Sequence, residues 1–441
     1  MSITMTTVIL FAVFGILLFL GVPISISIVA SSIVTAMSTL SWDQITFITM
    51  QKMNSGVESF SLLAVPLFIL AGNIMNNGGI AKRLVNFAQL FVGKIPGSMA
   101  QANILGNMLF GALSGSSVAA ASAMGGCISP IEEENGYDPA YSAAANIASA
   151  PTGLLIPPTS AFIVYSTVAG GVSISTLFMA GYIPGILMSI SMMIVVAIIS
   201  KKRNYPTTRD KFPPIKEVLR QAFISFWGLF FPFGIILGMR FGMFTPSEGG
   251  AVAVLYCFVI GKLVYKRLSF RKHFVPIVLD TIAGTSSVVL IMVSASVFGQ
   301  YMTWINLPKI VTTAVLNLTS NKYVFLLLTN VILLIMGMFL EGGAALMIIT
   351  PLLLPVARSL GIGVYHFGLV AIVNIMIGGI TPPFGSMMFT TCGITKCPIS
   401  DFLKEVWPFI VCLVLVLLLL TFFPTLINIV PDLIYGAEGG I

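Results

Sequence analysis

Long runs of apolar residues, separated by short breaks rich in glycine, proline and polar residues, follow one another along almost the whole chain. A helix of about twenty apolar residues crosses the roughly 30 Å of hydrocarbon in a bilayer. We expect about a dozen crossing or half-crossing segments, at approximately 4–38, 60–77, 98–129, 140–169, 174–200, 222–240, 249–265, 274–300, 308–319, 323–357, 363–394 and 405–434. The pattern predicts an all-α, polytopic membrane protein.

The first apolar run, 1–20, has the length of a secretory signal peptide. It contains no basic residue, and its apolar character continues to Ile33 without a small-residue cleavage site. We therefore expect this run to be retained as a transmembrane helix.

Composition agrees with a membrane protein. Of the 441 residues, 57% are hydrophobic and 8% are charged, and the mean hydropathy is +1.02. A soluble fold of this composition would have too little polar surface to cover its core.

The net charge of +7 comes mainly from two basic blocks, with seven Lys or Arg residues in 201–220 and five in 262–272. The positive-inside rule places both on the cytoplasmic side, so the chain between them crosses the membrane twice. We predict that 201–221 is a basic cytoplasmic linker that sets orientation and contacts anionic lipids. Neither block is interleaved with aromatic residues in a soluble module, so we expect no nucleic-acid partner.

The residue patterns of enzymes are missing from the sequence. Its five cysteines and two histidines show no metal-ligand spacing, and we expect the cysteines to be small packing residues. The chain contains no Walker A sequence, dinucleotide fingerprint or nucleophile elbow. We therefore expect neither enzymatic activity nor a cofactor.

An internal repeat divides the chain into two halves. At an offset of 225 residues, glycines and prolines of the first half align with identical residues of the second: Pro130 with Pro355, Gly136 with Gly361, Gly153 with Gly378, Pro157 with Pro382 and Pro158 with Pro383. Gly21-Val22-Pro23 corresponds to Phe244-Thr245-Pro246 at an offset of 223. We predict inverted repeats at 1–200 and 222–435.

Each half also contains two breaks in its helical pattern. The predicted elements are a re-entrant hairpin at about 98–129 with its tip at 114–117, a helix at about 140–169 broken at 153–160, a second hairpin at about 335–357 with its tip at 339–343, and a helix at about 363–394 broken at 378–385. Interrupted helices offer N–H groups to anions and carbonyls to cations. Such paired breaks are typical of a secondary transporter and mark its binding site.

Hairpin tip and helix break together offer hard oxygen ligands for Na⁺. The first predicted site consists of the side chains of Ser114 and Ser116 with main-chain carbonyls near Gly153, Ile156 and Pro158. Applying the repeat offset gives a second site, at Phe339, Glu341, Gly378, Thr381 and Pro383. The alternative for the serine cluster is close helix packing by small residues.

Candidate substrate contacts lie beside these ions, at Ser117, Thr159, Ser160, Glu341 and Arg240. An intramembrane carboxylate such as Glu341 is a functional candidate, which would bind a cation, a substrate hydroxyl or a proton. The alternative is a tip residue that reaches water. Arg240 would pair with an anionic substrate or snorkel from the end of its helix.

At these residues the sequence resembles the large membrane (permease, M) subunit of tripartite ATP-independent periplasmic (TRAP) transporters, over essentially the whole chain. The resemblance rests on 55–72 (SGVESFSLLAVPLFILAG), 113–118 (LSGSSV), 156–160 (IPPTS), 242–251 (GMFTPSEGGA) and 380–383 (ITPP). Family members commonly have aspartate at the place of Glu341, and many have aspartate at the place of Ala120.

The resemblance implies a multi-pass protein of the bacterial inner membrane that imports organic acids, such as sialic acids or C4-dicarboxylates, with Na⁺ as the coupling ion. It implies an elevator mechanism, in which a transport domain of two hairpins and two broken helices moves against a scaffold. Its implied partners are a small four-helix membrane subunit and a periplasmic substrate-binding protein. The alternative function is a Na⁺/dicarboxylate symporter or exchanger that works without a binding protein.

Overall fold

The computed structural model describes residues 3–58, 60–114, 116–209, 213–382 and 397–436, together with 385, 387–388 and 392–393. Every regular element in this part of the chain is helical, so the predicted all-α class is confirmed. A helix satisfies the backbone hydrogen bonds of an apolar segment within the segment itself, which lipid demands.

The helices follow one another with short connections. The first half forms α1 (Ile3–Phe19), α2 (Ile24–Ala36), α3 (Trp42–Ser55), η1 (Phe60–Leu63), α4 (Ala64–Asn77), α5 (Ile80–Val92), α6 (Ser98–Ser114), α7 (Ser117–Glu134), α8 (Pro139–Ser149), η2 (Ala150–Leu155), α9 (Ser160–Val168) and α10 (Ile174–Arg203). The second half forms α11 (Ile215–Arg240), α12 (Pro246–Val259), η3 (Ile260–Val264), α13 (Phe270–Trp304), α14 (Leu307–Leu318), α15 (Lys322–Phe339), α16 (Gly342–Ser359), α17 (Val364–Gly378), α19 (Ile399–Phe422) and α20 (Thr425–Tyr435).

Several helices are long and apolar enough to cross a membrane. Within the described residues there are six of them, or up to eight if each of two bent pairs is counted as one span. One bent pair joins Pro139–Leu155 to Ser160–Val168 at 54°, and the other joins Ile215–Gly228 to Phe233–Arg240 at 52°. These spans support a multi-pass membrane protein.

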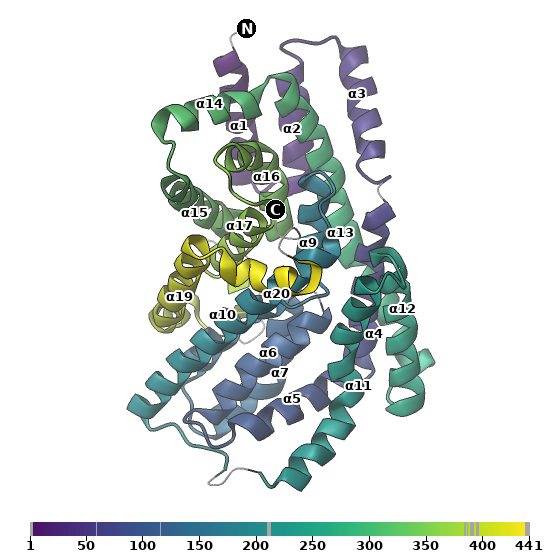
Figure 1. Ribbon diagram of the computed structural model, residues 1–441, viewed down its shortest axis with the longest axis vertical. Helices are drawn as coiled ribbons and strands as arrows, with labels where there is room; N and C mark the ends of the chain where they lie inside the picture. The colour runs from purple at the N-terminus through teal and green to yellow at the C-terminus, as the bar shows by residue number, and fades with distance from the viewer. Residues whose placement is uncertain are drawn as a thin grey trace.

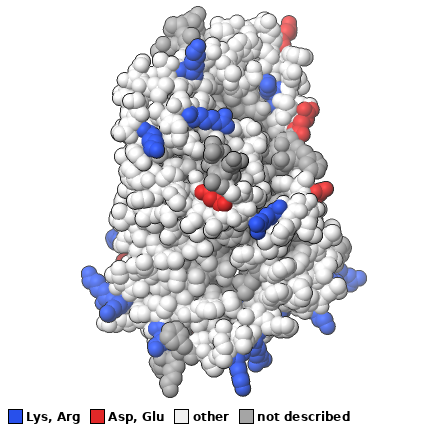
Figure 2. All heavy atoms as spheres, in the orientation of Figure 1, with Lys and Arg blue, Asp and Glu red and all other residues white. Residues whose placement is uncertain are grey.

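Basic side chains gather at the end of the molecule where α10 ends and α11 begins (Figures 1 and 2). The last turn of α10 contains Lys201, Lys202 and Arg203, whose charges interact favourably with the negative end of the helix dipole. Arg203 reaches Glu405 of α19 at 2.8 Å, which ties two helices together at this end. From the positive-inside rule we expect this end to lie in the cytoplasm.

The outer faces of α11, α12 and α13 carry large apolar side chains. Phe223 is 81% exposed, Leu255 66% and Val275 59%. Such surfaces are costly in water and favourable against lipid hydrocarbon or another membrane helix.

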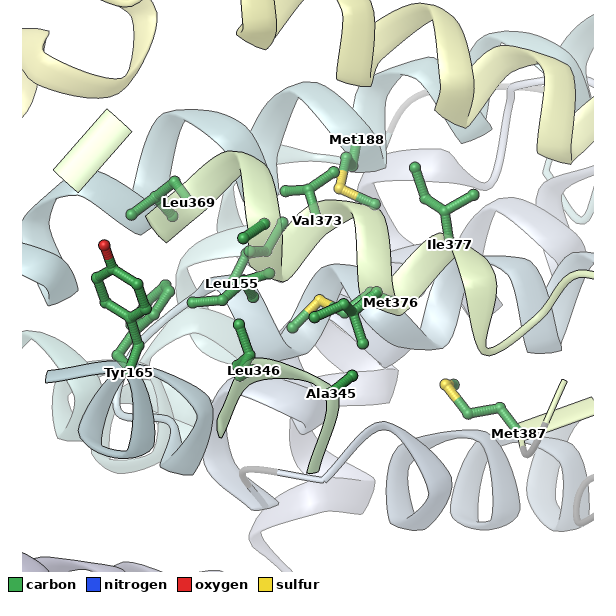
Figure 3. Packing of buried hydrophobic residues seen from close by; sticks show 14 of the residues in the cluster. Leu155, Tyr165, Met188, Ala345, Leu346, Leu369, Val373, Met376, Ile377 and Met387 are labelled. Atoms are coloured by element: carbon green, nitrogen blue, oxygen red, sulfur yellow. The ribbon is translucent and has the colours of Figure 1, made fainter. Parts of the chain in front are cut away.

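The core is packed where the helices of the two halves meet. Leu155 of η2, Tyr165 of α9 and Leu346 of α16 are buried beside residues of α17 (Figure 3). The Tyr165 hydroxyl donates to the main-chain oxygen of Val364 at 2.6 Å. A Cβ on Gly368 would lie 2.3 Å from the Tyr165 ring, so α17 approaches α9 closely only because this residue is glycine.

Candidate functional site

The first predicted hairpin tip lies between α6 and α7, which pack against each other. α6 ends at Ser114, whose side chain is outside the described part of the structure, and α7 begins at Ser117. Ser116, between the two helices, lines a cavity of about 370 Å³. The tip therefore brings one of the two predicted serine ligands to this cavity.

The first helix break is built by local sequence. The Asp138 side chain caps α8 by accepting from the backbone N–H of Ala140 at 2.7 Å, and Pro139 occupies the first helical position. The helical hydrogen bonds then continue in the 3-10 helix η2, which ends before Pro157 and Pro158. These two prolines have no N–H to donate. α9 restarts after Thr159, whose hydroxyl accepts from the N–H of Ala161 at 3.2 Å.

Tip and break of the first half are held against each other by close backbone contact. A Cβ on Gly153 would lie 2.3 Å from the Cα of Gly111, so η2 and α6 touch through two glycines. Asn107 of α6 donates to Asn146 of α8, with 2.9 Å between Nδ2 and Oδ1. Gly153, Ile156 and Pro158, the predicted carbonyl ligands, are all buried.

The second half repeats this arrangement. A Cβ on Gly378 would lie 2.6 Å from the Cα of Gly337, which brings the end of α17 against α15. Asn374 of α17 donates to Asn330 of α15, with 2.9 Å between Nδ2 and Oδ1. Thr381 follows the end of α17 and is buried, with its hydroxyl donating to the Ile377 carbonyl at 2.6 Å. Pro383 lies outside the described residues.

The second predicted tip lies between α15 and α16. Phe339 ends α15 and is 47% exposed. The exposed carboxylate of Glu341 caps α16, accepting from the N–H groups of Gly343 at 3.0 Å and Ala344 at 3.4 Å. A negative charge is stabilised at this position by the helix dipole.

Residues of both tips and both breaks line the same cavity, to which α4 and α13 also contribute. Its lining consists of Ile69, Gly72, Asn73 and Asn76 of α4; Phe110, Ser116, Ser117 and Val118 of the first hairpin; Leu154, Ser160, Ala161 and Val164 of the first broken helix; Asp280, Gly284, Val288 and Ile291 of α13; Leu340, Glu341, Gly342, Gly343, Leu346 and Met347 of the second hairpin; and Ile372, Ile375, Met376, Gly379 and Met387. Among these residues the charged ones are Asp280 and Glu341, both acidic.

Four predicted site residues meet in this cavity, namely Ser116, Ser117, Ser160 and Glu341. The Ser117 hydroxyl donates to the Met387 sulfur at 3.2 Å, which connects the first tip to the segment after the second break. Thr159 is fully buried and is not in the lining. Arg240 is exposed at the end of α11, with its guanidinium 5.5 Å from the Phe241 ring, and is also not in the lining.

Sequence reasoning missed the polar residues that α4 and α13 contribute. Asp280, Asn73 and Asn76 line the cavity together with residues of the two tips. Asn73 also donates to the Thr281 hydroxyl at 3.0 Å and thereby joins α4 to α13. The sequence did contain a signal for Asp280, because an aspartate within an apolar run is a functional candidate by default.

Comparisons with known proteins agree with one another. The family model described as "Tripartite ATP-independent periplasmic transporter, DctM component" matches residues 11–426. The chain is 42% identical to the uncharacterized protein YgiK of Salmonella typhimurium, over 97% of each chain. It is 36% identical to the sialic acid TRAP transporter large permease protein SiaM of Vibrio cholerae, over 95% of this chain and 97% of that one.

Two further matches extend this likeness. The chain is 33% identical to the C4-dicarboxylate TRAP transporter large permease protein DctM of Rhodobacter capsulatus, over 98% of this chain and 100% of that one. Among solved structures, the YdaH transporter of Alcanivorax borkumensis aligns with a TM-score of 0.62 over 91% of each chain, at 16% identity. That structure shares the fold.

Proposed function

Because the chain belongs to the DctM family of large membrane subunits of tripartite ATP-independent periplasmic transporters, we propose that it is the transmembrane subunit of a Na⁺-coupled importer of organic acids in a bacterial inner membrane. The names of two relatives support sialic acid or a C4-dicarboxylate as the substrate. The observation that carries the proposal is the cavity between the two tips and the two breaks.

The proposed Na⁺ sites lie beside this cavity. Site 1 consists of Ser114 and Ser116 with the carbonyls of Gly153, Ile156 and Pro158. Site 2 consists of Phe339, Glu341, Gly378, Thr381 and Pro383. Support comes from the burial of the first break and from the presence of Ser116 and Glu341 in one cavity lining. No cofactor other than the coupling ion is proposed.

The charge of the cavity supports ion binding before substrate binding. Asp280 and Glu341 are the charged residues of its described lining, and they repel an organic anion. A Na⁺ ion at each site would neutralise this charge and order the tips. Substrate would then contact Ser117, Ser160 and Glu341, which line the cavity, whereas Thr159 and Arg240 lie outside its lining and are not proposed as contacts. Two ions also suit strong accumulation, since each supplies only about 2.3 kcal/mol per 100 mV of membrane potential.

Paired contacts support the proposed inverted repeats. Gly111 against Gly153 corresponds to Gly337 against Gly378 at offsets of 226 and 225 residues, and each half also joins its hairpin to its broken helix by an asparagine pair, Asn107 with Asn146 and Asn330 with Asn374. Each half thereby locks its hairpin to its broken helix. We propose that 98–169 and 322–394 form the transport domain of an elevator, and that the other helices, α4, α12 and α13 among them, form the scaffold.

The partners proposed are the small four-helix membrane subunit and a periplasmic binding protein that delivers substrate. Relatives of nearly the same length are named as large permease proteins of such transporters. The second candidate function is a symporter or exchanger that works without a binding protein.

The test is uptake of radiolabelled sialic acid and succinate into proteoliposomes that contain this chain and its small partner. Each substrate is assayed with and without binding protein and with and without a Na⁺ gradient. We expect uptake to need both the binding protein and the Na⁺ gradient. We also expect Ser116→Ala to raise the Na⁺ concentration for half-maximal uptake about tenfold, which corresponds to about 1.4 kcal/mol of binding free energy.

The matched control is Ser122→Ala in α7, because the Ser122 hydroxyl donates to the Val118 carbonyl of its own helix. It should leave the Na⁺ dependence unchanged. Uptake without Na⁺ would contradict the coupling, and uptake without binding protein would favour the second candidate function.

A further inference from the structure

A buried carboxylate lies far from the cavity, at the cytoplasmic end of α7. Glu132 is 0% exposed, and neither of its carboxylate oxygens has a hydrogen-bond partner among the described residues. None of the ion pairs in this part of the chain includes it: Arg203 pairs with Glu405, Arg209 with Glu217 and Lys404 with Asp401. A buried charge without a partner is costly, so Glu132 requires a counter-charge or a proton.

Two buried hydroxyl groups accompany this carboxylate. Ser129 lies three residues earlier in α7, on the same helix face, and is 8% exposed. Ser142 of α8 is 0% exposed and lies close enough to lower the pKa of Glu132. Neither hydroxyl makes a hydrogen bond of ordinary length and angle among the described residues, although Ser142 lies near enough to the Glu132 carboxylate to interact with it. Helical serines commonly donate to the carbonyl four residues back, as Ser122 does, whereas the hydroxyls of Ser129 and Ser142 remain available as ligands.

We propose that the carboxylate of Glu132 and the hydroxyls of Ser129 and Ser142 bind one Na⁺ ion, at a site separate from the two of the proposed function. Carboxylate and hydroxyl oxygens are hard ligands that suit a hard cation. One carboxylate matches the charge of a monovalent ion. The site lies about 21 Å along α7 from Val118 at the first tip, by the rise of about 1.5 Å per residue.

Two tyrosines of the neighbouring segment, Tyr137 and Tyr141, lie near Glu132. Tyr137 stacks on Tyr205 with 4.4 Å between ring centroids, and its hydroxyl donates to the Pro206 carbonyl at 3.1 Å. Tyr137 and Tyr141 both lie near enough to Glu132 to interact with its charge. Since Ser129 belongs to α7 and Ser142 to α8, a bound ion would fasten the base of the first hairpin to the start of the first broken helix.

A proton competes with the ion for the same oxygens. Burial raises the pKa of Glu132 from 4.5 to about 7, against a smaller opposing effect of Ser142 and with a small added contribution from Glu133. Ion binding at this site should therefore weaken about tenfold for each pH unit below 7, because only the ionised carboxylate binds Na⁺.

The test is equilibrium binding of ²²Na⁺ to the purified full-length chain at pH 8 and pH 6. We expect Glu132→Gln, which keeps the shape of the side chain, to bind one Na⁺ fewer per chain at pH 8. The loss should add to that of Ser116→Ala, because the two sites are separate. Glu133→Gln is the matched control, since Glu133 is exposed in the same turn, and it should retain every ion.

Ser142→Ala is a milder variant that keeps the carboxylate, and it should weaken the same ion about tenfold. The proposal is overturned if Glu132→Gln and Ser142→Ala both bind as many ions as the wild-type chain with unchanged affinity. The proposal is also overturned if Glu132 takes up a proton at pH 6 while the Glu132→Gln and Ser142→Ala chains bind as much Na⁺ as the wild-type chain. Wild-type Na⁺ affinity in Ser116→Ala alone would count against site 1 and leave this site standing.

Discussion

At the scale of single residues, Glu132 makes stability depend on pH. Its pKa is raised from 4.5 to about 7 by burial, so the unfolded chain ionises at a lower pH than the folded one. Between pH 4.5 and 7 the folded state binds more protons, and stability falls as pH rises. The full change is about 3 kcal/mol, at about 1.36 kcal/mol per pKa unit.

We therefore expect the melting temperature of the chain in Na⁺-free potassium buffer to fall from pH 5 to pH 7.5. Glu132→Gln should flatten this profile, because it removes the titrating group while keeping the side chain's size. The measurement is a thermal unfolding series in detergent, with Glu133→Gln as the control. A wild-type profile as flat as that of the variant would contradict the assignment.

At the scale of elements, the second tip combines two roles in one side chain. Glu341 caps α16 through two backbone N–H groups and also lines the cavity. Loss of a cap costs about 1 kcal/mol, whereas loss of an ion ligand acts on transport. Two substitutions separate these roles, because glutamine keeps an oxygen acceptor for the cap and alanine keeps none.

We expect Glu341→Gln to melt close to the wild-type temperature and to raise the Na⁺ concentration for half-maximal uptake about tenfold or more, or about 1.4 kcal/mol. Glu341→Ala should share that transport defect and also lower the melting temperature. Melting curves and uptake titrations on the same preparations provide the measurement. If Glu341→Gln keeps the wild-type Na⁺ dependence, Glu341 caps α16 but is not an ion ligand.

The sequence predicted elements wherever their cause is local. Two consecutive prolines, Pro157 and Pro158, remove two adjacent N–H donors and favour a helix end, and η2 and α9 flank this break. The approach of Gly111 to Gly153 was not predicted, because it depends on how α6 lies against η2. For the same reason the sequence alone did not show that Asp280 faces the cavity or that Arg240 is outside its lining. Both outcomes follow from the rotation of packed helices.

At the scale of the whole molecule, the cavity lies between parts that an elevator would move past each other. α16 belongs to the proposed transport domain and α13 to the proposed scaffold. They meet at the cavity wall, where Val288 of α13 packs against the buried cluster that includes Met347 of α16. Transport by sliding requires this contact to break in each cycle. A rigid pore with gating tips would leave it intact.

A covalent bond across this contact therefore distinguishes the two mechanisms. We expect Val288→Cys with Met347→Cys, in a chain whose five native cysteines are replaced, to lose uptake when cross-linked by a short bifunctional maleimide. The same double-cysteine chain, cross-linked instead with a linker that contains a disulfide, should recover uptake when that disulfide is reduced. The readout is proteoliposome uptake against the cross-linked fraction on a gel.

The matched control joins two scaffold helices. Met75 of α4 and Cys257 of α12 have their sulfur atoms 3.9 Å apart, so Met75→Cys in the same background, with Cys257 restored, places two thiols within reach of each other. Cross-linking there should leave uptake unchanged, because α4 and α12 do not move relative to each other in the proposed cycle. Full uptake by the chain cross-linked between positions 288 and 347 would instead show that α16 stays in place relative to α13. In that case α16 would not belong to the transport domain.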